Sequence, residues 1–213
     1  MIFADRLEAG ERLARALGHL AGSDCVILAI PRGGVIVGEV VARELAAPLD
    51  GVVPRTIGAP GNPELAIGAI APGVRVLDPR MVGALGVTES YLQREIAAQE
   101  AEIERRQHAF REGRPPQRIE GRVAVVVDDG VATGSTAVAA LRWARAEGAS
   151  RVILAVPVAP PQTLARLKPE ADELVMLETP EPFFAVGEWY RDFDQTTDEQ
   201  VIAALARSAA SRA

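Results

Sequence analysis

Two adjacent aspartates, Asp128 and Asp129, stand between an apolar run and a loop of small and hydroxyl-bearing residues. The segment reads VVVDDGVATGST over residues 125–136. A run of valines predicts a buried strand, and two like charges at its end carry a cost that the site is expected to recover. The residue types therefore indicate a polar ligand site at the carboxyl end of a strand.

The loop after the aspartates has the composition of a phosphate site. A helix is expected to follow it, and a helix N-terminus offers unpaired N–H groups and a positive dipole end to an anion. Gly134 allows the backbone to approach a ligand closely, while Thr133, Ser135 and Thr136 add hydroxyl donors. Because the aspartates would repel a phosphate, we expect them to face the vicinal hydroxyls of the same ligand. The stretch thus predicts a ribose 5-phosphate site.

The residues exclude two other phosphate-binding motifs. A Walker A loop needs lysine directly after its last glycine, where this chain has Ser135, and the one lysine is Lys168. No G-x-G-x-x-G run follows a predicted strand. The alternative without a ligand is an aspartate that caps a helix through a tight turn, but a cap needs one aspartate and not this series.

The amino-acid composition limits the kinds of ligand and partner that the protein is expected to bind. The net charge of −6 argues against general nucleic-acid binding, which needs a basic face. Among 23 basic residues only Lys168 is not arginine, so arginine must supply the cations for an anionic ligand. The two histidines and Cys25 form no cluster with metal-ligand spacing, and Cys25 is expected in the core rather than as a nucleophile.

The same composition indicates the cellular compartment in which we expect the protein. The apolar runs are too short to span a bilayer, and the N-terminal segment lacks the apolar region of a signal peptide. A single cysteine permits no internal disulfide, which is typical of a reducing compartment. We therefore expect a cytoplasmic protein without a membrane partner.

Apolar runs alternate with helical patterns along the chain. The expected strands are residues 25–30, 49–53, 122–127, 151–158 and 173–177, and the expected helices are residues 4–21, 35–45, 88–112, 136–147 and 163–167. Residues 66–70 and 74–77 predict a β-hairpin. Uniformly apolar strands separated by helices predict an α/β fold with a parallel sheet covered on both faces. In such sheets, ligands bind beyond the carboxyl ends of the strands.

The segment VVVDDGVATGST resembles the signature of the type I phosphoribosyltransferases: an apolar strand, two acids and a Thr-Gly-x-Thr loop. The resemblance implies that the loop holds the 5-phosphate of phosphoribosyl pyrophosphate (PRPP) and that Asp128 and Asp129 hold the ribose hydroxyls. The phosphate-binding residues would be Ala132, Thr133, Gly134, Ser135 and Thr136.

The resemblance also implies the fold of that family. This is a Rossmann-like parallel sheet flanked by helices, with a β-hairpin and helical insertion and a small hood formed by the chain ends. We expect one domain over residues 1–213, with the helical insertion at about 88–114 and the hood element at about 178–200. The helix over 88–112 stands where the family usually has a flexible, catalytically important loop. Its role as a replacement for that loop, a dimer contact or a lid stays open.

Two further segments extend the resemblance. AIPRGG is similar to the pyrophosphate loop of the family, where Gly33 and Gly34 would aim N–H groups at the diphosphate and Arg32 would supply charge. Taken alone, PRGG is equally a plain turn. The segment VVPRTIGAPGNPELAIGAI resembles the second-strand region in a predicted subgroup of the family, and this resemblance implies that Arg55 reaches the diphosphate. Thr56 stands where the family often has another basic residue.

A C-terminal segment bears on the acceptor. FFAVGEWYRDF is similar to the segment of purine enzymes in which an aromatic residue stacks on the base. Phe184 matches the stacking position, and Trp189 is a second candidate for contact with the base. A core aromatic is the alternative interpretation of Phe184.

The resemblance implies transfer of the phosphoribosyl group from PRPP to a nitrogen of a nucleobase-like acceptor, with release of pyrophosphate. Asp128, Asp129 and Arg32 would be the catalytic residues, and Mg²⁺ would be held mainly by substrate and water rather than by the protein. A homodimer is implied by the resemblance alone. The alternatives are a non-catalytic protein of the same fold that senses PRPP or a nucleotide, and a hydrolase that acts on a sugar phosphate.

Overall fold

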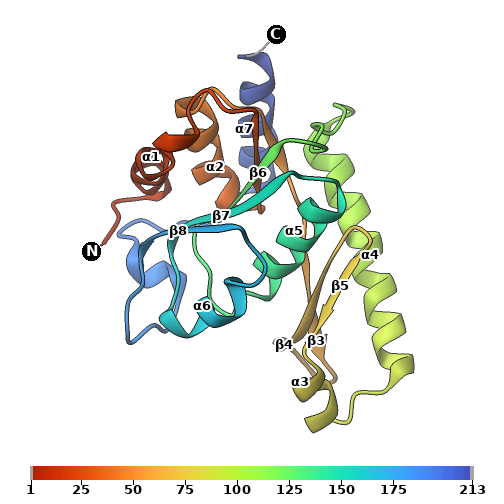
Figure 1. The fold of residues 1–213 in the computed structure, drawn as a ribbon. Helices are drawn as coiled ribbons and strands as arrows, with labels where there is room; N and C mark the ends of the chain where they lie inside the picture. Colours follow the sequence, from red (N-terminus) through yellow and green to blue (C-terminus); the bar gives the residue numbers. More distant parts are fainter. Residues whose placement is uncertain (1, 212–213) are drawn as a thin grey trace.

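A five-stranded parallel sheet forms the centre of the structure (Figure 1), a computed structural model that describes residues 2–211 of the chain. The strand order is β2-β1-β6-β7-β8, and all neighbouring strands are parallel. The strands are β1 (Cys25–Ala29), β2 (Leu49–Gly51), β6 (Val123–Val127), β7 (Arg151–Val158) and β8 (Glu173–Glu178). The uniformly apolar runs thus became a parallel sheet, as predicted.

Helices cover both faces of this sheet. One face carries α1 (Arg6–Ala16), α2 (Gly33–Glu44) and α7 (Asp198–Ala210), and the other carries α5 (Ser135–Ala146) and α6 (Pro161–Leu167) (Figure 1). Side chains alternate along a strand, so Ile27 packs into the core under α1 and α2, and Leu28 packs into the core under α5. The predicted α/β fold class is confirmed.

An insertion between β2 and β6 forms a second, antiparallel sheet of β3 (Arg55–Ala59), β4 (Asn62–Ala71) and β5 (Val74–Leu77). The predicted hairpin is the β4–β5 pair. β3 is not predicted from the sequence, because its register is interrupted on both sides of Gly58 and the strand is defined by its pairing with β4. A side chain at Gly58 would meet the backbone of Pro63 at 2.6 Å, so this close pairing requires glycine.

The long helix α4 (Glu89–Arg111) packs beside this small sheet and forms an extension on the right of Figure 1, after the short α3 (Pro79–Ala84). Its predicted apolar stripe is buried: Leu92, Ile96, Ile103 and Phe110. The C-terminal end of α4 is anchored to β2, since the buried Asp50 carboxylate accepts from Arg111 Nη2 at 3.1 Å. The helix is therefore part of the packed structure.

Three helix predictions need correction. The predicted helix over residues 4–21 is shorter, because Asp5 caps α1 by accepting from the Glu8 amide at 2.8 Å, and a separate 3₁₀ turn, Gly18–Leu20, follows. No helix is predicted for the short α3, nor for α7. The signal for α7 was present as a capping box of Thr197 and Gln200 before buried residues at helical spacing.

The two ends of the chain meet to form a hood, defined here as residues 2–4 together with 179–197. The Phe3 amide donates to the Trp189 carbonyl at 2.7 Å, and the Asp192 amide donates to the Ala4 carbonyl at 2.9 Å. The Phe3 and Tyr190 rings lie 5.3 Å apart. The 3₁₀ helix η2 (Val186–Trp189) lies within the hood. Within residues 2–211, no helix combines the length and apolar character needed to cross a membrane.

Candidate active site

The strand order reverses between β1 and β6. From β1 the chain continues to β2 on one side, whereas β6, β7 and β8 follow on the other side, so the loops after β1 and β6 diverge from a common point. Ala29 pairs with Val127, the last residues of the two strands, so both loops leave the sheet at the same level. Such a switch point opens a crevice at the carboxyl edge of the sheet, where ligands bind.

The two loops touch each other at this point. A Cβ atom at Gly33 would overlap Asp129 Oδ2, and one at Gly34 would lie 2.8 Å from the Cα atom of Asp128. Only glycine fits at either place, so the PRGG turn begins α2 directly against Asp128 and Asp129, hereafter the acid pair. The peptide bond between Pro31 and Arg32 in this turn is cis.

The loop after the acid pair leads into α5. Gly134 is the N-cap, with φ of +80°, and no side chain of the described residues caps the helix. The Ala132 carbonyl accepts from Thr163 Oγ1 at 2.8 Å, and the Thr133 carbonyl accepts from Arg166 Nη1 at 3.4 Å. The start of α6 therefore braces this loop from behind, and the first N–H groups of α5 are without a side-chain cap. Ala132 and Thr133 are exposed, Thr136 is half-buried and Ser135 is buried.

Three hydrogen bonds orient the acid pair. Asp129 Oδ2 accepts from Arg6 Nε at 2.8 Å, and the Asp129 amide donates to Asp128 Oδ1 at 2.8 Å. The Tyr190 hydroxyl donates to the Asp129 carbonyl at 2.5 Å. Burial raises the pKa of the Asp128 carboxyl well above its usual range, and the neighbouring charge of Asp129 adds to this. Burial also raises the pKa of the Asp129 carboxyl, while Arg6 opposes the change.

The two predicted cations lie in different places. Arg32 precedes Gly33 in the PRGG turn. Its side chain is about one third exposed, and its Nη1 lies 3.8 Å from Asp198 Oδ1 at the start of α7. Arg55 instead contacts α4, because its Nε donates to Gln99 Oε1 at 2.8 Å. Burial lowers the pKa of Arg55, and the nearby charge of Arg106 contributes. Within the described residues, the Arg55 side chain hydrogen-bonds α4 and not the acid pair, and its diphosphate role stays a prediction.

The aromatic candidates differ from each other in exposure. Phe184 is 78% exposed, which excludes its interpretation as a core aromatic. Trp189 is half-buried, and its indole N–H is buried without a hydrogen-bond partner in the described part of the chain. Phe184 is thus open to a ligand, whereas the side chain of Trp189 packs within the hood beside Phe3 and Tyr190. Contact of either residue with a base stays a prediction.

A comparison with known protein families identifies the family of this chain. Residues 5–192 match the family model described as phosphoribosyl transferase domain. The chain belongs to this family. The match includes the acid pair, the PRGG turn and the loop before α5, and it ends within the hood.

Relatives of this phosphoribosyl transferase domain cover nearly the whole chain. It is 48% identical over 208 residues to the Mycobacterium tuberculosis H37Rv protein named "Putative phosphoribosyl transferase Rv0571c", a match that covers 97% of the chain and 47% of the relative. The chain thus spans about half the length of the curated relatives it matches.

Solved structures agree with the fold. The crystal structure of TT1426 from Thermus thermophilus is 47% identical with a TM-score of 0.82, covering 97% of this chain and 99% of that one. A purine phosphoribosyltransferase from Pyrococcus horikoshii Ot3 is 16% identical with a TM-score of 0.50, covering 90% of this chain and 93% of that one. The second likeness concerns the fold alone.

Arg6 and Tyr190 both contact the acid pair of this phosphoribosyl transferase domain, and the sequence analysis assigns neither to it. Arg6 is 123 residues from Asp129 in the chain, so no local pattern could join them. Its only signal was indirect, since nearly every cation in the sequence is arginine. Tyr190 belongs to the aromatic segment FFAVGEWYRDF, but its contact with the Asp129 carbonyl joins residues 61 positions apart and has no local sequence signal.

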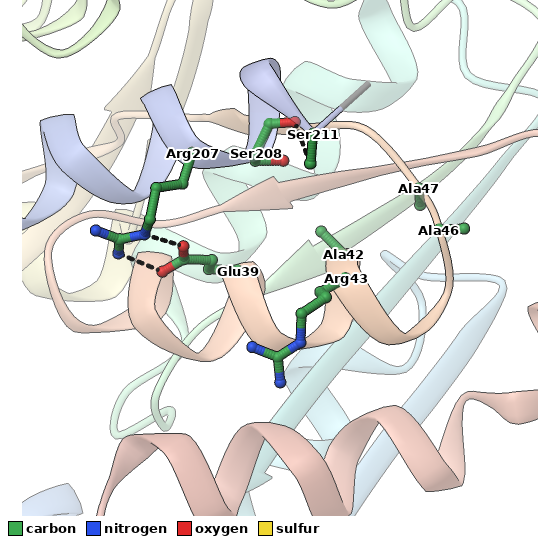
Figure 2. A pocket seen from close by; sticks show the side chains of 8 residues that line it. All are labelled: Glu39, Ala42, Arg43, Ala46, Ala47, Arg207, Ser208 and Ser211. Atoms are coloured by element: carbon green, nitrogen blue, oxygen red, sulfur yellow. Dashed lines mark hydrogen bonds and ion pairs between the residues drawn. The ribbon is translucent and has the colours of Figure 1, made fainter. Parts of the chain in front are cut away.

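A pocket of about 470 Å³ lies elsewhere, between α2 and α7 (Figure 2). Its charged lining includes Arg207 and Glu39, which are paired with each other at 2.7 Å, and Arg43. α2 rises about 1.5 Å per residue, so the pocket at its C-terminal end lies more than a helical turn from Gly33 at its N-terminal end. The acid pair does not line this pocket. The candidate active site is therefore the switch point with the acid pair, and not the pocket between α2 and α7.

Proposed function

We propose that the chain transfers the 5-phosphoribosyl group from PRPP to a nitrogen of a nucleobase-like acceptor and releases pyrophosphate. The observation that supports this is the direct contact between the PRGG turn and the acid pair at the switch point. One side of the contact offers carboxylates for a diol, and the other side offers backbone N–H groups and Arg32 for a diphosphate. The uncapped start of α5 then serves the 5-phosphate.

The reaction breaks the bond between C1 of the ribose and the diphosphate oxygen, and the electron pair leaves with pyrophosphate. The acceptor nitrogen forms the new bond to C1 and loses its proton. Positive charge develops near C1 during this exchange, and the acid pair stabilises it by its negative field. Arg32 stabilises the charge that grows on the leaving diphosphate. No protein nucleophile is required.

We expect Mg²⁺ to bind at this site together with the substrate. Mg²⁺ prefers oxygen ligands and keeps several waters, and residues 2–211 contain no group of three histidine, cysteine or acidic side chains arranged to hold a metal. We expect diphosphate and ribose oxygens together with water to hold the ion, while the acid pair binds the ribose. When bound, the ion neutralises part of the charge on the leaving group.

Location follows from the same proposal. Cys25 is buried and free of any disulfide, which is typical of proteins kept in a reducing compartment. The proposed substrate, PRPP, is a charged sugar diphosphate, and we expect such a substrate inside the cell. We therefore propose that the domain acts in the cytoplasm.

A panel of nucleobases and related heterocycles, assayed for pyrophosphate release from PRPP with Mg²⁺, tests the proposal. At least one acceptor is expected to support release, and the double variant Asp128→Ala/Asp129→Ala is expected to abolish both release and PRPP binding. Asp24→Ala removes an exposed acid far from the switch point and is the matched control. Unchanged PRPP affinity in the double variant would contradict the ribose assignment.

The runner-up function is a sensor that binds PRPP or a nucleotide without turnover. It is favoured by one observation, the contact of Arg55 with Gln99 on α4, which occupies a cation expected on the diphosphate. In the same panel a sensor binds PRPP and releases no pyrophosphate with any acceptor. A hydrolase is distinguished by release of pyrophosphate or ribose 5-phosphate without an acceptor.

A further inference from the structure

Arg6 is held against the acid pair by contacts from two separate parts of the chain. Its Nε donates to Asp129 Oδ2 at 2.8 Å, and its Nη1 donates to the Asp194 carbonyl at 2.8 Å. Its guanidinium carbon lies 3.9 Å from the centroid of the Phe193 ring. With its side chain 11% exposed, Arg6 has little freedom to turn away from Asp129.

The contact occupies one oxygen of a residue that the proposed function assigns to the ribose. Asp129 is 15% exposed, so few water molecules screen the ion pair with Arg6. When both carboxyls are ionised, the acid pair and Arg6 together carry a net charge of −1. Without Arg6, two adjacent carboxylates would share a buried space with no cation in hydrogen-bond contact, and at least one would tend to protonate.

We propose that Arg6 is a positioning residue of the sugar site, which keeps Asp129 ionised and turns it so that its second oxygen accepts a ribose hydroxyl. This inference rests on the proposed function. The Arg6 side chain is almost buried and already paired with Asp129, so we expect it to act on the substrate through Asp129 and not by direct contact. The N-terminal helix thereby becomes part of the site although it carries none of the motif residues.

Other titratable or charged residues belong to the elements packed around the acid pair. They come from the PRGG turn, where Arg32 adjoins Gly33, and from the hood, where the Tyr190 hydroxyl binds the Asp129 backbone. Burial raises the pKa of Tyr190, so this phenol stays neutral over the range in which carboxyls titrate. Asp194 touches Arg6 through its backbone carbonyl. Arg6 is the cation that hydrogen-bonds a carboxylate of the pair among these groups.

Two variants of Arg6 and one control test the proposal. Arg6→Gln removes the charge, Arg6→Lys restores it without the guanidinium plane, and Arg12→Gln is the matched control. Arg12 is also in α1, stacks on an aromatic ring of the hood and pairs with Glu178 at 3.3 Å, but it has no contact with Asp129 in the described structure. PRPP affinity with Mg²⁺ would be measured by calorimetry from pH 5.5 to 8.5.

Arg6→Gln is expected to weaken PRPP binding about ten- to hundred-fold at pH 7, the range for a charge-assisted hydrogen bond. The pH below which affinity falls is expected to rise by about one unit or more, since an adjacent cation lowers a carboxyl pKa by that amount. Arg6→Lys should recover most of the pH midpoint, and Arg12→Gln should match the wild type. Equal losses in Arg6→Gln and Arg12→Gln with one common midpoint would overturn the proposal.

A second readout separates this proposal from the proposed function. The carboxyl carbons of the acid pair are titrated by NMR in the ligand-free protein, as wild type and as Arg6→Gln. The Asp129 carboxyl is expected to titrate at higher pH in the variant. An unchanged titration refutes the role of Arg6 even if PRPP binds, whereas a shifted titration with no PRPP binding by the wild type refutes the proposed function alone.

Discussion

The Tyr190 hydroxyl donates a hydrogen bond to the Asp129 carbonyl across 2.5 Å, and this bond joins the hood to the acid pair over 61 residues of sequence. The Tyr190 ring also stacks near Phe3 and Phe193, at centroid distances of 5.3 and 5.0 Å. Phe3, near the N-terminus, therefore packs against the ring whose hydroxyl binds the Asp129 carbonyl. The position of the acid pair depends on the hood as well as on β6.

Tyr190→Phe should destabilise the fold by about 1–3 kcal/mol, because it leaves a part-buried carbonyl without its partner while the ring packing stays. Urea unfolding measures the change. Tyr91→Phe is a suitable control, since the Tyr91 hydroxyl donates to the Gly58 carbonyl at 2.9 Å in the small sheet, away from the acid pair. PRPP affinity should fall in Tyr190→Phe and stay constant in Tyr91→Phe. The reverse order of effects on affinity would show that the hood does not support the site.

Gly33→Ala should weaken PRPP binding by about a hundred-fold or more. The added methyl group would overlap Asp129 Oδ2, so the acid pair or the start of α2 must move, and displacement of a binding group by about 1 Å costs roughly that much. Gly83→Ala in α3 meets no atom within 4 Å and is the control. Normal binding by Gly33→Ala would mean that the PRGG turn is not part of the site.

Asp128→Asn should stabilise the protein at neutral pH and abolish its ligand binding. Burial raises the pKa of Asp128 in the folded state, so the folded protein binds more protons than the unfolded chain between the two pKa values. Stability therefore falls as pH rises through that window, by about 1.4 kcal/mol for each unit of pKa difference. Asparagine removes this cost and can still accept from the Asp129 amide.

Thermal unfolding of Asp128→Asn and the wild type from pH 4 to 8 checks this. The two melting temperatures should lie close together at pH 4 and diverge as pH rises, with the variant higher. Parallel curves over the whole range would contradict a raised pKa at Asp128.

Arg32→Ala should slow pyrophosphate release more than it weakens ribose 5-phosphate binding. Arg32 is expected to stabilise charge that grows on the leaving diphosphate, and ribose 5-phosphate has no such group. Turnover is measured with PRPP and an active acceptor, and binding is measured with ribose 5-phosphate by calorimetry. Arg43→Ala, at the far end of α2 beside the pocket of Figure 2, is the control. Equal losses in turnover and in ribose 5-phosphate binding would contradict the assignment of Arg32 to the diphosphate.

The elements around the switch point could be predicted because their signals are local. The valine run before Asp128 predicts β6, the small residues after it predict a loop, and α5 begins at Ser135, one residue before the predicted start. The stripe of α4 was equally readable. β3 was not, since an interrupted five-residue strand is defined by its partner β4 and not by its own pattern.

Residue order alone determined the strand, the acid pair, the loop and the helix start, because hydrophobic periodicity and turn chemistry act over a few neighbouring residues. The tertiary structure decided which groups meet there: Arg6 on Asp129, Tyr190 on its carbonyl, Arg55 on α4 and Phe184 in the open. Those meetings depend on strand order and on the contact between the two chain ends. Neither leaves a trace in any short stretch of sequence, since the contacting residues are brought together only by the packing of the whole sheet.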